Sequence, residues 1–240
     1  MIYAYGITQQ GTYHININLV CQDAHEIIKY AKNICVAAVA DGLGSEDHSD
    51  IASLVAVKIA TKYCVENISE ISSTEEIIDV IQNSFIRAQK KIEEEVDKNG
   101  HELNQYGTTL SLVVVINDDL YFGHAGDSGI IALTTDGLYT KVTTQQRDEE
   151  GRVFPLRFNE DRWVFGKFNK KVASVFLATD GMYETLFPFY IRDEKVSINV
   201  TLARFFMDNR ILHIDEIGEE ATRARIAEFI TNIPDAQVND

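Results

Sequence analysis

The middle of the chain contains four apolar, β-branched stretches that are joined in pairs by very short polar turns. The stretches cover residues 108–116, 120–125, 129–133 and 138–142, and the turns are Asn117-Asp118-Asp119 and Asp136-Gly137. Turns of this length connect antiparallel strands, because parallel neighbours need a crossover of a dozen or more residues. The chain also lacks a GxGxxG motif. We therefore predict an antiparallel meander and disfavour a Rossmann-like parallel sheet.

Helical patterns lie on both sides of this meander. Apolar residues between Ile51 and Tyr63 follow the i, i+3, i+4 spacing of an amphipathic helix. A second helix is predicted from the capping box at Ser73 to the stop at Gly100. Further helical patterns occupy residues 200–206 and 217–230, and further strand patterns occupy residues 12–20, 34–40 and 172–178. Because strands and helices come in blocks, we expect an α+β fold with helices packed on antiparallel sheets.

The length and charge of the chain limit its organisation and its partners. The 240 residues are expected to form a single domain, residues 1–240, because layered β folds often reach this length. The polar segment 144–171 is interpreted as a flap-like excursion of that domain and not as a linker. Lys and Arg number 22 against 37 for Asp and Glu, which gives a formal net charge of −15. Such a surface repels nucleic acid and anionic membranes, so neither is an expected partner.

Cysteine usage and the N-terminal sequence bear on the compartment. Cys21, Cys35 and Cys64 are an odd number without CxxC spacing, which disfavours a disulfide framework and a zinc motif. The start, MIYAYGITQQ, lacks the basic and apolar regions of a signal peptide. No stretch approaches the roughly 18 apolar residues of a membrane span. We therefore expect a cytoplasmic protein.

Three apolar stretches end at an aspartate that has a glycine close beside it. They read VAAVADG up to Asp41-Gly42, LYFGHAGDSG around Asp127, and VFLATDG up to Asp180-Gly181. A rigid strand can present a carboxylate at its end in this way, while glycine leaves backbone room for a bound ion. Carboxylates and water, without a cysteine or histidine cluster, favour a hard cation such as Mg²⁺ or Mn²⁺ over zinc or copper.

Asp-Gly is also a common turn dipeptide, so each aspartate has a structural alternative. Asp136 and the two aspartates of the Asn117 turn are flanked by hairpin residues and are assigned to turns. For each of the three strand-end aspartates alone the turn interpretation stays open. Three strand ends of the same design nevertheless favour a shared site.

The same blocks, taken in order, carry a resemblance to a known family. The blocks are QDAH at residues 22–25, VAAVADGLGS at 36–45, YGTTLSLVVVINDDLYFGHAGDSG at 106–129 and LATDGMYE at 177–184. They resemble the signature blocks of the metal-dependent serine/threonine protein phosphatases, the PPM or type 2C family. The resemblance spans residues 3–187. DGxG alone is a weak signal, but four blocks in this order, with a predicted helix pair between the second and third, are specific.

The resemblance implies a four-layer sandwich of two antiparallel β-sheets flanked by pairs of helices. It also implies two Mn²⁺ or Mg²⁺ ions at one end of the sandwich and a third, weaker metal site. Asp41 would bridge both ions, the Gly42 carbonyl would bind the second, and Asp180 would hold the first. Asp23 would order water around the second ion, and Asp127 would join Asp180 at the third site. Asp41, Asp180 and Asp23 are thereby the implied catalytic residues.

The activity implied by the resemblance is hydrolysis of phosphoserine and phosphothreonine in proteins, in a signalling role. Paired cations neutralise the phosphate and lower the pKa of a bridging water from about 15.7 towards neutrality, so that hydroxide can attack in line with the leaving oxygen. The expected partner is a phosphorylated protein. The acidic surface does not exclude it, because the cations supply a local positive field.

Several residues depart from the family pattern. Asn18 stands where an arginine usually clamps the substrate phosphate, and a neutral amide cannot replace a guanidinium. Gln22 replaces a glutamate, and Gly129 replaces an arginine. Leu43 stands where many eukaryotic members carry a histidine, and bacterial relatives commonly have an apolar residue there. We therefore expect a bacterial-like member with altered phosphate and metal contacts.

The end of the sequence departs as well. The family finishes with an aspartate, a threonine and a final apolar strand, whereas this sequence finishes at Asp240. Asp240 is a candidate for that metal ligand, with the final strand absent. This departure, together with Asn18 and Gln22, keeps open the alternative of a phosphatase-like regulatory or binding module without turnover. A plain calcium-binding domain is less favoured because EF-hand spacing is missing.

The sequence leaves the proton donor and the phosphate-binding cation unassigned. His124, beside the third block, and His25, after Asp23, are candidate proton donors, although a lone histidine is more often packed or on the surface. Four arginines of the excursion could replace the missing clamp, with a solvated charge run as the competing interpretation. They are Arg147, Arg152, Arg157 and Arg162.

Overall fold

The larger of two β-sheets has five antiparallel strands in the order β1-β2-β3-β4-β7. The computed structural model describes residues 1–11, 15–16, 19–186 and 198–232. The strands are β1 (Ala24–Ala31), β2 (Ile34–Ala40), β3 (Leu110–Ile116), β4 (Asp119–Ala125) and β7 (Val164–Lys167). Strands β3 and β4 are the first of the two predicted hairpins. The prediction of antiparallel pairing is therefore confirmed for this sheet.

The smaller sheet has three antiparallel strands in the order β6-β5-β8. They are β5 (Gly129–Thr134), β6 (Tyr139–Lys141) and β8 (Val172–Ala178). Strands β5 and β6 form the second predicted hairpin, whose turn contains Asp136-Gly137. Strand β8 pairs with the other edge of β5, although the excursion of residues 144–171 separates the two strands in the sequence.

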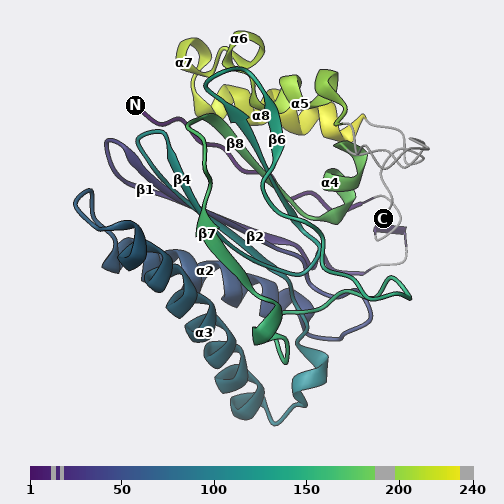
Figure 1. Ribbon diagram of the computed structural model, residues 1–240. Helices are drawn as coiled ribbons and strands as arrows, with labels where there is room; N and C mark the ends of the chain where they lie inside the picture. Colours follow the sequence, from purple (N-terminus) through teal and green to yellow (C-terminus); the bar gives the residue numbers. More distant parts are fainter. Residues whose placement is uncertain (12–14, 17–18, 187–197, 233–240) are drawn as a thin grey trace.

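Two long helices cover the outer face of the larger sheet (Figure 1). They are α2 (Ser49–Asn67) and α3 (Thr74–Asn99), and the short 3-10 helix η1 (Leu103–Gln105) follows them. The predicted capping box of α3 is confirmed, since Ser73 Oγ accepts from Glu76 N at 3.2 Å and Glu76 Oε2 accepts from Ser73 N at 2.7 Å. Gly100 ends the helix with a φ of 67°, a conformation that favours glycine.

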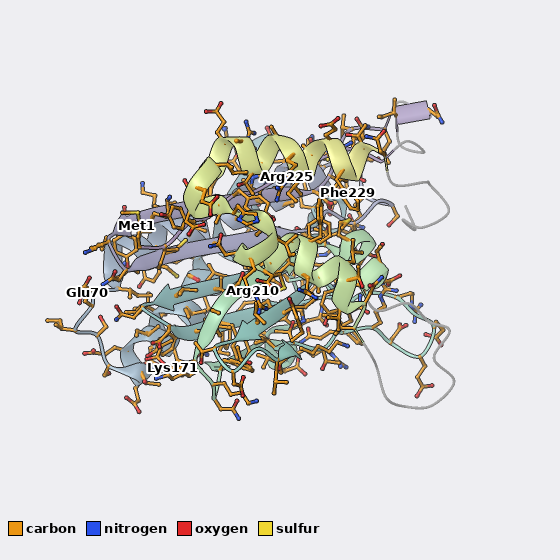
Figure 2. All side chains as sticks on the ribbon, turned by 90° about the horizontal axis from the view of Figure 1, so that it is seen from above. Met1, Glu70, Lys171, Arg210, Arg225 and Phe229 are labelled. Atoms are coloured by element: carbon orange, nitrogen blue, oxygen red, sulfur yellow. The ribbon has the colours of Figure 1, made fainter. Side chains whose placement is uncertain are left out.

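The C-terminal helices form the outer layer over the smaller sheet (Figure 1). They are α4 (Asp180–Leu186), α5 (Val200–Met207), α6 (Asn209–Leu212), α7 (Ile214–Ile217) and α8 (Glu219–Thr231). Figure 2 looks down on α8, which carries Arg225 and Phe229. The ring centroids of Phe229 and Phe205 lie 4.4 Å apart, so α8 packs on α5. Among the helices of the described residues, none has the length and apolar character that crossing a bilayer requires.

Side-chain alternation along the central strands explains why four layers form. On β3, Leu112 is buried in the cluster under α2 and α3, whereas Val113 belongs to a cluster with Ile130 of β5. The next residue of β5, Ile131, packs in a third cluster with Phe206 of α5. Successive residues of a strand point to opposite faces, so each sheet is apolar on both sides. The predicted α+β sandwich of two flanked antiparallel sheets is confirmed.

The N-terminal and excursion regions differ from the sequence-based expectations. The first strand of the larger sheet is β1 at residues 24–31, whereas the alternating stretch 12–20 has helical backbone at residues 15 and 16. Residues 12–14 and 17–18, which include Asn18, lie outside the described residues. Strand β1 is half-buried along most of its length, so its sequence lacks a clear alternation. Strand β7 lies in the excursion, after the short 3-10 helix η2 (Glu160–Arg162), and Val164 at its start is exposed.

The excursion is fixed to the sheets by specific bonds. Gln146 N donates to Gly126 O at 2.9 Å, and Gln146 Oε1 accepts from Gly126 N at 3.0 Å. Farther along, the Arg157 guanidinium donates to both carboxylate oxygens of Glu46, at 2.6 and 3.0 Å. Each side chain of this ion pair is only 11% exposed. The prediction of a solvated charge run is therefore wrong for Arg157, because the guanidinium is buried against a carboxylate.

Candidate metal centre

Asp41 directly follows β2, and two threonines before β3 hold its backbone. Asp41 N donates to Thr109 Oγ1 at 2.9 Å, while Asp41 O accepts from Thr109 N at 2.8 Å and from Thr108 Oγ1 at 3.0 Å. Thr109 Oγ1 also lies 2.9 Å from the hydroxyl of Ser128, the neighbour of Asp127. One threonine thus ties the end of β2 to the start of β5.

The pairing of β5 with β8 brings Asp127 and Asp180 together. Gly129 pairs with Ala178 in this antiparallel ladder. The residues two positions beyond this pair, Asp127 and Asp180, therefore leave the sheet at the same end. A Cβ at Gly129 would lie 1.9 Å from the ring of Tyr183. The arginine that the resemblance implies at this position would therefore collide with Tyr183.

The carboxylate oxygens of Asp41, Asp127 and Asp180 all lie within 4.8 Å of one another. The Asp127 side chain is only 2% exposed, whereas that of Asp180 is 28% exposed. Asp23 lies at their edge, where its Oδ2 accepts from Thr179 Oγ1 at 2.9 Å. The charge of Asp23 acts on Asp41, so the structure places aspartates from four separate parts of the chain near one another. We call Asp41, Asp127 and Asp180 the acidic group.

The pKa values of two of these aspartates reflect their crowding. Burial raises the pKa of the Asp41 carboxyl well above its usual range, and the charges of Asp23, Asp180 and Asp127 raise this pKa further. Burial and then the Asp180 charge raise the pKa of Asp127 to about 6, although Arg147 opposes the shift. A positive ion at this position would favour the charged carboxylates.

Gly42 and Gln22 fix the loop beside Asp41. Gly42 N donates to Gln22 O at 3.1 Å, and a Cβ at Gly42 would lie 2.7 Å from both Gln22 O and Ser49 O. Gln22 Nε2 donates at 2.6 Å to the hydroxyl of Ser49, the first residue of α2. The glutamine amide therefore anchors a helix start. The Gly42 carbonyl as a metal ligand stays a prediction, and Asp240 lies outside the described residues.

Arg147 reaches from the excursion into the acidic group. Its Nε donates to Asp127 Oδ2 at 2.8 Å, and its Nη2 donates to Asp180 Oδ2 at 2.9 Å. Nη2 also lies 2.9 Å from Glu184 Oε1, in an ion pair outside hydrogen-bond geometry. The interpretation as a solvated charge is therefore wrong for Arg147. The sequence could not single out Arg147 from the other arginines, because these contacts join residues 20 and 33 positions apart.

Glu184 is a site residue that sequence reasoning missed. It follows Asp180 by four residues on α4, a spacing that places both side chains on one face of the helix. The spacing of four residues from Asp180 is the sequence signal that could have identified Glu184. The Glu184 side chain is 13% exposed, and its Oε1 is a buried oxygen without a hydrogen-bond partner among the described residues. A carboxylate oxygen of this kind suits a cation.

The two candidate proton donors differ in burial. His124 is 1% exposed, with Nδ1 2.8 Å from Ser111 Oγ and Nε2 3.1 Å from Thr144 O. His25 Nδ1 lies 2.6 Å from Thr8 Oγ1 in the N-terminal segment. His124 therefore fits the interpretation of a packed residue, whereas His25 is only partly buried and stays a candidate.

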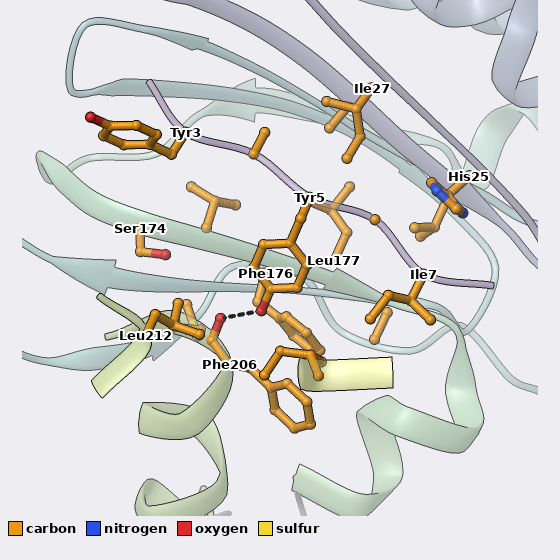
Figure 3. A pocket seen from close by; sticks show the side chains of 18 of the residues that line it. Tyr3, Tyr5, Ile7, His25, Ile27, Ser174, Phe176, Leu177, Phe206 and Leu212 are labelled. Carbon is orange, nitrogen blue, oxygen red and sulfur yellow. Dashed lines mark hydrogen bonds between the residues drawn. The ribbon is translucent and has the colours of Figure 1, made fainter. Parts of the chain in front are cut away.

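A cavity of about 940 Å³ lies between the N-terminal segment, β8 and the C-terminal helices. Its lining is largely apolar, and Tyr5 crosses it to donate through its hydroxyl to Phe206 O at 2.8 Å (Figure 3). Asp23 and Thr179 belong to the same lining. The cavity therefore extends to the edge of the acidic group.

Several solved structures share this arrangement of sheets and helices. A serine/threonine phosphatase of S. agalactiae is similar with a TM-score of 0.57 and 20% identity, over 76% of this chain and 80% of that chain. A bacterial serine phosphatase gives 0.54 and 14% identity, over 86% and 84% of the two chains. RsbX in complex with magnesium gives 0.50 and 14% identity, over 89% and 81%. At these identities the likeness concerns the fold alone.

Sequence comparison adds a match to one family. No curated protein sequence matches the chain. The family model described as protein phosphatase 2C, however, matches residues 10–211, from the N-terminal segment through both sheets to the helices of the C-terminal layer. The match covers most of the 240 residues and includes every aspartate of the acidic group. By this measure the chain belongs to the protein phosphatase 2C family.

Proposed function

We propose that the chain is a Mn²⁺- or Mg²⁺-dependent protein phosphatase that hydrolyses phosphoserine and phosphothreonine. The observation that carries the proposal is the meeting of three carboxylates, from distant parts of the chain, within 4.8 Å of one another. Membership of the protein phosphatase 2C family supports the reaction class. The similar structure named a serine/threonine phosphatase supports the substrate, and the similar structure of RsbX in complex with magnesium supports the cofactor.

The donors at the site fit a hard divalent cation. They are carboxylate oxygens, which Mg²⁺ and Mn²⁺ prefer. The raised pKa of Asp41 reflects burial and neighbouring negative charges, which a bound cation would offset. In our proposal Asp41 would hold both ions, Asp180 the first and the Gly42 carbonyl the second, while Asp23 would order water around the second. Asp127 and Asp180 would hold a third, more weakly bound ion, and Asp240 stays a candidate ligand.

The protein positions these groups before substrate arrives. When bound, the cations reduce the repulsion between a phosphate dianion and an attacking anion, and they lower the pKa of a coordinated water. Thr108 and Thr109 hold the Asp41 backbone from both sides. The register of β5 with β8 sets Asp127 against Asp180. Such rigid placement avoids reorganisation during the reaction.

Hydrolysis of a small aryl phosphate tests this proposal. We expect activity that depends on added Mn²⁺ and that falls by about 100-fold or more in Asp41→Asn and in Asp180→Asn, because loss of residues that only support metal ligands already costs 10–100-fold. Asp136→Asn is the matched control, since Asp136 lies in the β5–β6 turn, where it bonds to Thr134. Activity that is indifferent to the metal and to both site changes would contradict the proposal.

A phosphatase-like binding or regulatory module is the second candidate, and the Arg147 contacts favour it. A guanidinium in the acidic group neutralises part of the charge that a metal would use. Calorimetry separates the two candidates. Binding of Mn²⁺ or of a phosphopeptide without measurable turnover supports the module, whereas metal-dependent turnover supports the phosphatase.

The proposal also covers the partner, the compartment and the domain organisation. The partner is a phosphorylated protein, and nucleic acid and membrane are not expected partners for a chain of net charge −15. Cys35 and Cys64 are buried and Cys21 is partly exposed, and all three are thiols in the structure. This supports a reducing, cytoplasmic compartment. Residues 1–240 are proposed to act as one phosphatase domain.

A further inference from the structure

We propose that Arg147 is a built-in cation that competes with a divalent metal ion for Asp127 and Asp180. A metal ion enters this half of the site only when the guanidinium leaves it. The inference rests on the proposed function, because it concerns the same carboxylates. It adds that Arg147 sets the metal concentration at which this part of the site becomes occupied.

The contacts of Arg147 are those of a charge held in place of an ion. Its guanidinium nitrogens lie 2.7 to 2.9 Å from oxygens of Asp127, Asp180 and Glu184. Arginine stays protonated at every ordinary pH, so this charge is permanent. One positive charge against three carboxylates leaves two negative charges in formal terms. The guanidinium therefore neutralises the cluster in part, and a divalent ion would neutralise it further.

The backbone keeps Arg147 at this position. The preceding residue, Gln146, makes two hydrogen bonds with Gly126, and its Nε2 donates to Arg162 O at 2.7 Å. Arg147 itself forms an antiparallel bridge with Val153. Because the backbone is fixed on both sides, the guanidinium returns to the carboxylates whenever a metal ion leaves. Such a tethered group competes at a high effective concentration.

The competition concerns one half of the acidic group. Asp127 and Asp180 bind Arg147 directly, whereas the contacts that fix Asp41 come from Thr108 and Thr109. Glu184 is drawn to the same guanidinium, although its Oε1 lacks a hydrogen bond among the described residues. A metal ion bound to Asp127 and Asp180 must break two charge-assisted hydrogen bonds, whereas an ion bound to Asp41 and the Gly42 carbonyl would break neither.

Population arithmetic gives the expected size of the effect. The apparent affinity of a ligand falls by the fraction of molecules whose site is open. If the guanidinium is displaced in about one molecule in ten, the apparent affinity for metal is about tenfold weaker than that of an open site. Removal of the guanidinium should therefore strengthen metal binding by about that factor.

The test is a calorimetric titration of the full chain with MnCl₂ at neutral pH. We expect Arg147→Gln to bind one Mn²⁺ about tenfold more tightly than the unaltered protein. Arg147→Lys should give a smaller gain, because an ammonium cannot bond to Asp127 and Asp180 with the geometry of the guanidinium fork.

Two further variants control the test. Arg152→Gln removes the same charge from the same excursion, but Arg152 is 75% exposed and pairs with Asp148 and Glu150 away from the site. It should leave Mn²⁺ affinity unchanged. Asp127→Asn in the Arg147→Gln background should abolish the gain. Persistence of the gain in this double variant would place its origin elsewhere and overturn the inference.

Thermal melting gives a readout that separates competition from support of the fold. Arg147→Gln should melt below the unaltered protein in EDTA, because Asp127, Asp180 and Glu184 then lack their cation. The difference should shrink or reverse in saturating Mn²⁺. An equal loss of Tm in both buffers would mean that Arg147 only supports the fold, and would overturn the inference.

The outcomes for the inference and for the proposed function are distinct. Equal Mn²⁺ affinity in the unaltered protein and in Arg147→Gln overturns the inference and leaves the metal centre intact. Absence of Mn²⁺ binding in both proteins overturns the two together. Tighter binding in Arg147→Gln without phosphatase activity supports the inference and favours the binding module.

Discussion

Both ring nitrogens of His124 are engaged inside the protein. Thr144 O can only accept, so Nε2 carries the proton and donates to it, and Nδ1 accepts from the hydroxyl of Ser111. This tautomer is neutral. Burial lowers the pKa of His124 to about 4, although hydrogen bonding to backbone carbonyls opposes the shift. The imidazole thus has a structural role that depends on its staying uncharged.

We predict that His124 makes the metal-free protein less stable in acid. Its pKa is about 4 when folded and near 6.5 when unfolded, so its contribution is complete above pH 6.5 and is lost as the pH falls towards 4. At about 1.4 kcal/mol per pKa unit, the loss in unfolding free energy between pH 7 and 4.5 is about 2 to 3 kcal/mol. Urea denaturation of the unaltered protein and His124→Asn at both pH values measures it. Identical losses in the two proteins would contradict the prediction, because they share all other titrating groups.

Some site residues could be predicted from their neighbours in the sequence, and others could not. Asp41, Asp127 and Asp180 could be predicted because each ends an apolar strand beside a glycine, a local pattern. Arg147 could be named only as one of four arginines, because its partners are distant in the sequence. Glu184 follows Asp180 by four residues, but α4 has only 7 residues and is too short to show a strong helical periodicity.

At the scale of elements, the Arg157–Glu46 ion pair joins the excursion to the loop between β2 and α2. Glu46 Oε2 also accepts from Gly107 N, just before β3. A Cβ at Gly107 would lie 2.4 Å from Arg157 Nη1. Three connecting segments therefore meet at one buried ion pair beside the end of β2.

Loss of one partner of this pair should destabilise the protein strongly. Arg157→Met leaves Glu46 as a buried charge without its cation, a loss that typically costs about 3 kcal/mol or more. Replacement of both residues, in Glu46→Gln with Arg157→Met, should recover part of that loss. Arg152→Met, at a 75% exposed ion pair, should cost less than about 1 kcal/mol. Urea denaturation of the three variants checks the order, and a cost of Arg157→Met no larger than that of Arg152→Met would refute it.

The elements that could be predicted well from the sequence have either a regular hydrophobic periodicity or a recognisable capping residue at an end. Helix α3 has both a capping box and a terminal glycine, and its two ends were predicted at the observed residues. Strand β7 was not predicted, because Val164 at the edge of the larger sheet is exposed and the strand is four residues long. Strand β1 was missed because half-burial on both faces removes the alternation that marks a strand.

For the whole molecule, the N-terminal segment links β1 of the larger sheet, through Thr8 and His25, to the C-terminal helices. Tyr5 crosses the 940 Å³ cavity to Phe206 of α5 (Figure 3), and Ala4 N donates to Glu219 Oε1 of α8 at 2.7 Å. Burial raises the pKa of the Tyr5 hydroxyl, which therefore stays protonated and acts as a donor. The segment holds the C-terminal helices against the sheets over a space that apolar side chains leave partly unfilled.

We predict that Tyr5→Phe lowers the free energy of unfolding by about 1 kcal/mol, because Phe206 O loses its hydrogen bond while the ring still lines the cavity. Tyr3→Phe is the control, since Tyr3 is 40% exposed. Thermal melting of both variants measures the effect. Equal Tm values for Tyr5→Phe and Tyr3→Phe would show that the hydroxyl contributes nothing.

The ladder that aligns Gly129 with Ala178 has a consequence for comparing homologues. An insertion of a single amino acid into β8 would shift the rest of this strand by one rung along β5 and turn each following side chain of the strand to the opposite face. An aligned homologue with such an insertion would retain every aspartate of the acidic group in its sequence. It would nevertheless hold Asp127 and Asp180 apart, and inactivity would follow without the loss of any ligand.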